Sequence, residues 1–122
     1  MNFRGHVHES IYTKFLQSRN NAESDKATLS AAFLLSADSK MWNQAKRQIE
    51  NGEINFDEIK IESISTVQYT LLRAAQDLYE DTQHLSLADI SDRDIIPEWL
   101  FNIINEAIRI RRYGVKAGDI NC

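Results

Sequence analysis

The stretch from residue 96 to residue 113 constrains the fold more than any other part of this chain. Its apolar residues recur with the 3.6-residue repeat of a helix that is buried on one side. They are Trp99, Leu100, Ile103, Ile104, Ala107 and Ile108. Pro97 suits the first turn, where a missing N–H costs nothing, and Gly114 can end the helix. We therefore expect a long amphipathic helix whose apolar face packs on a core.

Four further segments have helical periodicity, at residues 6–19, 25–37, 39–50 and 65–81. The first presents one apolar face, formed by Val7, Ile11, Tyr12, Phe15 and Leu16. The second is apolar most of the way round, which predicts burial on more than one side. The third follows a cap at Asp38 or Ser39 and presents Met41, Trp42, Ala45 and Ile49. The fourth has the capping-box spacing of Ser65 and Gln68, and its apolar face is Val67, Leu71, Ala74, Ala75 and Leu78.

The remaining residues predict a polar break at 20–24 and two irregular segments, near 51–63 and 82–95. The first irregular segment follows a stop at Gly52, and its apolar residues alternate as in a short strand: Ile54, Phe56, Ile59 and Ile61. A lone strand would have no partner, so we expect an extended stretch with a short turn. The second is loop-like, with one turn near 85–90. Residues 1–6 are expected to form an irregular lead-in and residues 116–122 a frayed tail. The sequence thus predicts an all-α fold, a single compact bundle of about five helices forming one domain over residues 1–122.

The composition is that of an ordinary globular chain, with 43% hydrophobic and 26% charged residues. Its one cysteine, Cys122, excludes an internal disulfide and favours a reducing compartment. The sequence has no apolar run long enough to span a membrane, and its first residues lack the apolar core of a signal peptide. We therefore expect a cytoplasmic protein that does not bind membranes.

The net charge of −4 hides an uneven distribution. Residues 1–49 hold seven basic and four acidic side chains, residues 50–98 three and twelve, and residues 99–122 four and two. An acidic middle disfavours broad binding of nucleic acid, which needs a basic surface. It permits docking on a basic surface of another protein, while the simpler interpretation is a solvated face that aids solubility. The acidic residues that could bind a partner are Glu50, Glu53, Asp57, Glu58, Glu62, Asp77, Glu80 and Asp81.

No motif of catalysis or cofactor binding stands out. His6, His8 and Glu9 have the donor types of a zinc or iron site, but on a helix the side chains of His6 and His8 point about 200° apart. His84 lies in a distant segment, and Cys122 has no positioned base. The glycine-rich motifs of phosphate sites and the serine elbow of hydrolases are absent. We expect no metal, no cofactor and no catalytic activity; an enzyme that uses His8 and Glu9 is a rival hypothesis.

Two groups of basic residues favour an alternative function. Arg109, Arg111 and Arg112 suit the dipole at the end of the 96–113 helix, and Arg109 and Arg112 share a face that could grip a phosphate or an acidic partner. The helices at 25–37 and 39–50 are joined as tightly as a helix-turn-helix pair, and the second carries Lys46 and Arg47. Against this pair, the turn lacks glycine and the first helix is very apolar. The alternative is a DNA-binding regulator that uses one of these groups.

Three segments carry a family resemblance. Near the start, His8 and Glu9 precede the aromatic residues Tyr12 and Phe15. Residues 73–80, RAAQDLYE, align with a pattern like RLAFNLWN, and residues 106–113, EAIRIRRY, align with one like EAIKLRYP, with one extra arginine and Gly114 in place of the proline. The order and spacing of these three segments cover most of residues 3–114. In them the chain resembles a small uncharacterised helical family of Gram-positive bacterial genomes, their phages and mobile elements.

The resemblance implies a phage or mobile-element setting and no known chemistry. The family's Trp-Gln-Thr-Gly motif before the middle helix is replaced here by Ile-Glu-Ser-Ile at residues 61–64, so the resemblance does not extend to that motif. Because small helical proteins of this setting often work by binding, we expect a non-enzymatic, anti-CRISPR-like inhibitor of host antiviral defence. Its partner would be a host protein in the bacterial cytoplasm, such as a defence nuclease, bound through the acidic middle. The sequence is also compatible with a homodimer.

Overall fold

The computed structural model describes residues 1–18 and 25–115, and these residues form helices and connections without any strand. The helices are α1 (His6–Gln17), α2 (Lys26–Leu35), α3 (Ser39–Glu50), the short 3-10 helix η1 (Phe56–Glu58), α4 (Thr66–Glu80), α5 (Leu87–Ser91) and α6 (Glu98–Tyr113). The all-α prediction is confirmed, and the two helices beyond the expected five are the short turns η1 and α5. The polar break at 20–24, the end of the first helix at 19 and the tail at 116–122 lie outside the described residues.

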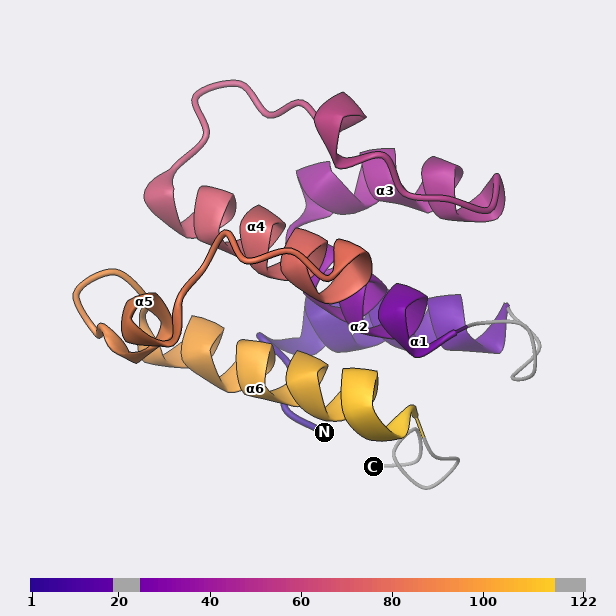
Figure 1. Ribbon diagram of the computed structural model, residues 1–122. Helices are drawn as coiled ribbons and strands as arrows, with labels where there is room; N and C mark the ends of the chain where they lie inside the picture. The colour runs from indigo at the N-terminus through magenta and orange to yellow at the C-terminus, as the bar shows by residue number, and fades with distance from the viewer. Residues whose placement is uncertain (19–24, 116–122) are drawn as a thin grey trace.

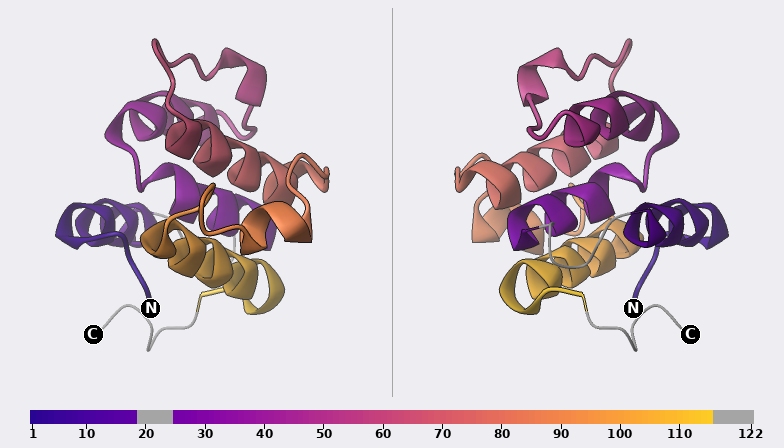
Figure 2. Two further views of the ribbon diagram at one scale, coloured as in Figure 1. Left: turned by 90° about the vertical axis from the view of Figure 1, so that its left-hand side faces the viewer. Right: turned by 90° about the vertical axis from the view of Figure 1, so that its right-hand side faces the viewer.

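Helix α2 occupies the centre of the bundle. It contacts α3, α4 and α6, and its residues from Ser30 to Leu35 are all buried, as expected for a helix that is apolar on most sides. The views in Figures 1 and 2 agree on this arrangement, with α3 above α2, α6 below it, and α1 and α4 on opposite sides. Helix α1 is fixed to α2 by Tyr12, which is fully buried and donates a hydrogen bond to the Leu29 carbonyl at 2.8 Å.

The N-terminal lead-in is irregular, as predicted, but it is tied to the bundle at several points. The Phe3 ring lies 5.6 Å from the Phe33 ring, so aromatic packing extends beyond the helices. The Asn2 N–H donates to the Glu106 carboxylate at 2.7 Å, and the Arg4 guanidinium lies 4.3 Å above the Trp99 ring. Asn2 and Arg4 therefore contact α6, which lies far away in the sequence, while Phe3 packs on α2.

The helix ends follow the capping signals in the sequence. Asp38 caps α3 by accepting from the Met41 N–H at 3.0 Å, and Gly52, with φ of 101°, follows the end of that helix. Ser65 and Gln68 form the expected capping box at the start of α4. Two irregular connections flank α4: residues 51–65 form the α3–α4 connection, and residues 81–86 form the α4–α5 connection. The extended stretch and short turn expected near 51–63 are confirmed, and η1 is the turn.

Two apolar assignments were wrong. Val7 is 72% exposed, and the buried stripe of α1 is His8, Tyr12 and Phe15, from which Val7 is rotated by about 100° on the helix. Ile108 is 42% exposed, whereas Ile110 is buried. The buried stripe of α6 faces α2 and ends with Ala107 and Ile110. Ile108 is rotated by about 100° from Ala107 around the helix, so it lies on the outer side.

Candidate interaction surfaces

The backbone of the α3–α4 connection is held by two side-chain amides of α3. Gln44 binds both backbone groups of Lys60, donating to its carbonyl at 2.6 Å and accepting from its N–H at 2.7 Å. One turn further along α3, the Gln48 side-chain oxygen accepts from the Asn55 N–H. We call these contacts the amide clamp. It supplies partners to backbone groups that have no helix or sheet to satisfy them.

Apolar side chains anchor the same connection to the core. Ile54, Phe56 and Ile59 are each about 5% exposed or less, and the Phe56 ring lies 5.8 Å from that of Tyr79 on α4. The Tyr79 hydroxyl also accepts from the Ile54 N–H at 3.2 Å. No strand forms here, but the alternating pattern of the sequence still separates the two sides of this segment. Its apolar residues point inward, and the residues between them point to solvent.

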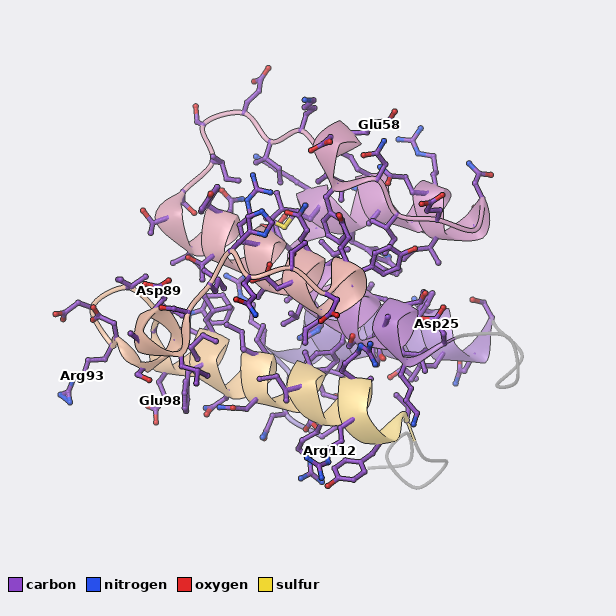
Figure 3. The ribbon with its side chains drawn as sticks, in the orientation of Figure 1. Asp25, Glu58, Asp89, Arg93, Glu98 and Arg112 are labelled. Atoms are coloured by element: carbon purple, nitrogen blue, oxygen red, sulfur yellow. The ribbon has the colours of Figure 1, made fainter. Side chains whose placement is uncertain are left out.

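The outward side chains of this region include five of the predicted partner-binding acids. Glu50, Glu53, Asp57, Glu58 and Glu62 are all exposed, and we call them the acidic face. Figure 3 shows Glu58 at the outer edge of the molecule. No Lys or Arg of the described residues lies within 4.0 Å of any of these five carboxylates. The acidic face therefore keeps its negative charge unpaired within the described part of the molecule.

The other three predicted acids lie near the end of α4 and have different roles. The Asp77 carboxylate binds the α4–α5 connection, accepting from the Thr82 hydroxyl at 2.7 Å and from the His84 and Leu85 N–H groups at 2.9 Å each. Its side chain is only 15% exposed. Glu80 accepts from Gln76 at 3.1 Å, and Asp81 is the left-handed cap of α4. Asp77 is thus occupied inside the molecule, unlike the acidic face.

The Asp77 hydrogen bonds also set its protonation. Burial alone would raise the pKa of this carboxyl, but the bonds from His84, Thr82 and Leu85 favour the ionised form. Their combined effect lowers the pKa of Asp77 below its ordinary value of 3.8. Asp77 is therefore ionised at neutral pH and bound by its own chain.

Further acids gather at the opposite end of the molecule, where the sequence predicts no site. Asp89 and Glu98 lie beside α5 and the start of α6, far from Glu58 in Figure 3. Asp89 caps α5 in a capping box with Ser86, and Asp92 accepts from the Asp94 N–H at 2.9 Å. The acidic middle of the sequence is therefore divided in space, because the chain crosses the bundle along α4.

The two helices of the predicted helix-turn-helix pair are both engaged within the bundle. Lys46 and Arg47 are exposed on α3, but Gln44 and Gln48 are engaged in the amide clamp, and α2 is buried at the centre of the bundle. Lys46 instead lines a groove between α1 and α3 together with Lys14, and the same groove is lined by the Phe15 and Trp42 rings, which lie 5.4 Å apart. The α2–α3 pair does not offer a free first helix of the kind that crosses a DNA backbone.

The three arginines at the end of α6 point in different directions. Arg111 donates to the Leu78 carbonyl in the last turn of α4 at 3.2 Å, so it caps a neighbouring helix. Arg109 lies 3.8 Å from the Glu106 carboxylate, and the guanidinium of Arg112 lies 5.3 Å from the Tyr113 ring. All three arginines are exposed, but Arg111 is also bonded to α4.

The residues of the rival metal hypothesis are not brought together. His8 is buried, accepts from the Arg4 N–H at 2.9 Å through Nδ1, and donates from Nε2 to the Phe33 carbonyl at 2.7 Å. Burial lowers its pKa to about 4, so the ring is neutral and both nitrogens are occupied. His6 is exposed, and His84 contacts Asp77. Within residues 1–18 and 25–115, no three His, Cys, Asp or Glu side chains are placed to hold a metal ion. Cys122 lies outside these residues.

Comparison with protein families, with curated proteins and with solved structures finds no match to this chain. The resemblance drawn from the three sequence segments therefore stays a prediction. None of the helices in the described residues is long and apolar enough to cross a membrane.

Proposed function

We propose that this chain is a binding protein that docks on a basic surface of another protein through the acidic face. The observation that supports the proposal is that five exposed, unpaired carboxylates lie at and beyond the end of α3. Four of them lie on a backbone that the amide clamp and three buried side chains hold in place. Charges in fixed positions steer a complementary surface before contact and select its orientation, which raises the association rate and the specificity.

Charge alone supplies little affinity, so the surface needs apolar anchors. Ile64 is 38% exposed and Tyr69 is 46% exposed, and both follow Glu62 closely in the chain. The Tyr69 ring is held 5.1 Å from the Arg73 guanidinium. A tyrosine oriented by a neighbouring arginine loses little freedom on binding, which suits it to a binding hot spot.

The proposal extends to the target. From the family resemblance we propose that the partner is a host protein of antiviral defence, and that the chain inhibits it by occupying a basic groove. Such a groove in a nuclease binds a nucleic-acid backbone, so an acidic protein surface competes with the substrate for the same positive charges.

The experiment is a comparative pull-down from a Gram-positive host lysate, followed by mass spectrometry. The baits are the parent chain, E53K/E58K on the acidic face, and E9K/D94K as a control with the same change in net charge elsewhere. The expected result is a host protein that is recovered in stoichiometric amount by the parent and the control and lost from E53K/E58K. With that protein in hand, the association rate of E53K/E58K should fall at least about tenfold at low salt.

Two results would contradict the proposal. Recovery of the same proteins by all three baits would remove the acidic face from the mechanism. Recovery of nucleic acid alone, lost from a bait with Lys46 and Arg47 replaced by glutamate, would favour the DNA-binding regulator instead. A steep loss of affinity for DNA with added salt would then support that alternative.

A further inference from the structure

One side of α6 presents a row of exposed residues at alternating spacings of three and four. They are Glu98, Phe101, Asn105, Ile108 and Arg112, and we call them the α6 seam. All five are exposed, with Phe101 at 40% and Ile108 at 42%. A row with this spacing is what a helix presents to a second helix in a coiled-coil contact, with the apolar side chains as knobs. On α6 the row lies outside the buried stripe that faces α2.

The α6 seam is complementary to itself when two copies run in opposite directions. With Asn105 at the centre, Phe101 of one copy lies opposite Ile108 of the other, and Glu98 lies opposite Arg112. We propose that the α6 seam is the contact of a homodimer, in which two α6 helices pack antiparallel about a two-fold axis at Asn105. Such an interface is isologous, because each contact occurs twice and only the central residue meets its own copy.

The charged ends of the seam favour this partner over an unrelated helix. Glu98 and Arg112 have no ion partner within 4.0 Å among the described residues, and Figure 3 shows them at opposite ends of α6, on its outer side. An antiparallel copy brings each carboxylate to the guanidinium of the other chain. It also places the two helix dipoles side by side in opposite directions, which is their favourable arrangement.

The central asparagine fixes the register. Its side-chain nitrogen donates to the Phe101 carbonyl at 3.0 Å, while its oxygen accepts no hydrogen bond from a described residue. In the dimer the two Asn105 amides can bond to each other, and a shift of the helices would leave these amides against apolar side chains. A single polar residue at such a position specifies pairing at some cost in stability.

The size of the contact predicts its strength. Helix α6 has 16 residues, so it is about 24 Å long, and each copy contributes two apolar side chains. A contact of this size falls in the class of weak, reversible interfaces, with a dissociation constant of about 10 µM to 1 mM. The acidic face lies across the bundle from α6, as the position of Glu58 in Figure 3 shows, so both copies keep it exposed. This proposal is therefore independent of the proposed function.

The test is sedimentation equilibrium of the full chain over a concentration series, with charge-swap variants. The parent should shift from monomer toward dimer mass as concentration rises to about 1 mM. E98R and R112E should each weaken association at least about tenfold, because each places like charges opposite each other twice. An equal mixture of the two variants should associate again, since every pair is then attractive, and so should the double variant E98R/R112E. R93E, an exposed charge outside the seam, is the control and should behave as the parent.

Two results would overturn the proposal. A parent chain that stays monomeric throughout the series has no such contact. Association that persists unchanged in E98R and R112E, or that is not restored in their mixture and in the double variant, would place the contact elsewhere. Because all of these positions are exposed, the variants keep their fold, which far-ultraviolet circular dichroism checks.

Discussion

The connections on either side of α4 are both irregular and both bound by the helix that precedes them, yet the binding differs in kind. The α3–α4 connection is held by neutral amides, Gln44 and Gln48, and by three buried apolar side chains. The α4–α5 connection is held by one carboxylate, Asp77, and none of its residues 81–86 is fully buried. A segment without secondary structure can thus be fixed either by apolar burial or by charge, and the two kinds of binding differ in their sensitivity to mutation and pH.

Removing an apolar anchor should cause the largest loss. Phe56→Ala should lower the free energy of unfolding by about 3–5 kcal/mol, because it leaves a cavity beside Tyr79 and removes the main anchor of the α3–α4 connection. Urea denaturation at neutral pH measures the change. Phe101→Ala, at a half-exposed position, should lose less than half as much. Equal losses for both would show that the α3–α4 connection does not depend on its buried ring.

Removing the carboxylate should cause the second largest loss. Asp77→Ala should cost about 2–3 kcal/mol at pH 7, because it leaves the polar groups of Thr82, His84 and Leu85 without their acceptor. Asp94→Ala is the control, since its carboxylate is exposed. The same denaturation experiment compares them, and a loss in Asp77→Ala no larger than in the control would contradict this role.

The cost of Asp77→Ala should also depend on pH. Because the pKa of Asp77 is lowered in the folded state, its contribution is complete above the unfolded value of 3.8 and is lost as the pH falls through the folded pKa. The gap in stability between parent and variant should thus be constant near neutrality and close only in strong acid. Denaturation curves at a series of pH values test this, and a gap that closes above about pH 5 would contradict it.

His8 is a second group that makes the stability of the protein sensitive to acid. Because the parent and Asp77→Ala both contain His8, its effect cancels in the difference between their free energies of unfolding. The pKa of His8 falls from 6.5 to about 4 on folding. Between these two values the His8 ring is protonated in the unfolded chain and neutral in the folded chain. Stability should therefore decline in both proteins as the pH falls from about 6.5 to about 4. His8→Gln should remove most of this decline, whatever its cost at neutral pH.

Breaking the amide clamp should have a smaller effect. Gln44→Ala should cost about 1 kcal/mol, because both of its bonds to Lys60 lie near solvent and water can replace them. Amide hydrogen exchange is the sharper measurement: the Lys60 N–H should lose protection, while amides of α2 keep theirs. Asn43→Ala, one residue earlier on the exposed side of α3, is the matched control. Unchanged protection of Lys60 in Gln44→Ala would exclude the clamp in solution.

The smallest effect should come from the apolar residue that follows the α4–α5 connection. Leu87 is 83% exposed, so Leu87→Ala should change the free energy of unfolding by less than about 0.5 kcal/mol. Thermal or urea denaturation suffices. A loss comparable to that of Phe56→Ala would mean that Leu87 is buried in solution, and the contrast between the two connections would fail.

The helices could be predicted because their signals are local. The capping box of Ser65 and Gln68, the cap at Asp38 and the stripe around Trp42 each depend on residues within a turn or two, and all are confirmed. The wrong assignments of Val7 and Ile108 have a different origin. The periodicity of a helix gives the width of its apolar stripe, but the neighbouring helices decide which edge of the stripe is covered.

The surfaces could be predicted only in part, since they depend on contacts between distant residues. For the part of the acidic face between residues 53 and 58, exposure follows from positions beside the apolar Ile54, Phe56 and Ile59, which the sequence displays. The role of Asp77 does not, because an aspartate that binds the next connection resembles a solvated one until Thr82 and Leu85 are placed beside it. The α6 seam likewise emerges only when the buried side of α6 is known.

The amide clamp has a consequence for misfolding. Residues 54–56 and 59–61 each alternate apolar and polar side chains in the manner of an edge strand, the kind of segment that recruits other extended chains into aggregates. Gln44 occupies both the N–H and the carbonyl of Lys60, and Gln48 occupies the N–H of Asn55. Two glutamines on one helix thus take the place of a neighbouring strand, and an incoming chain finds these backbone groups already bonded.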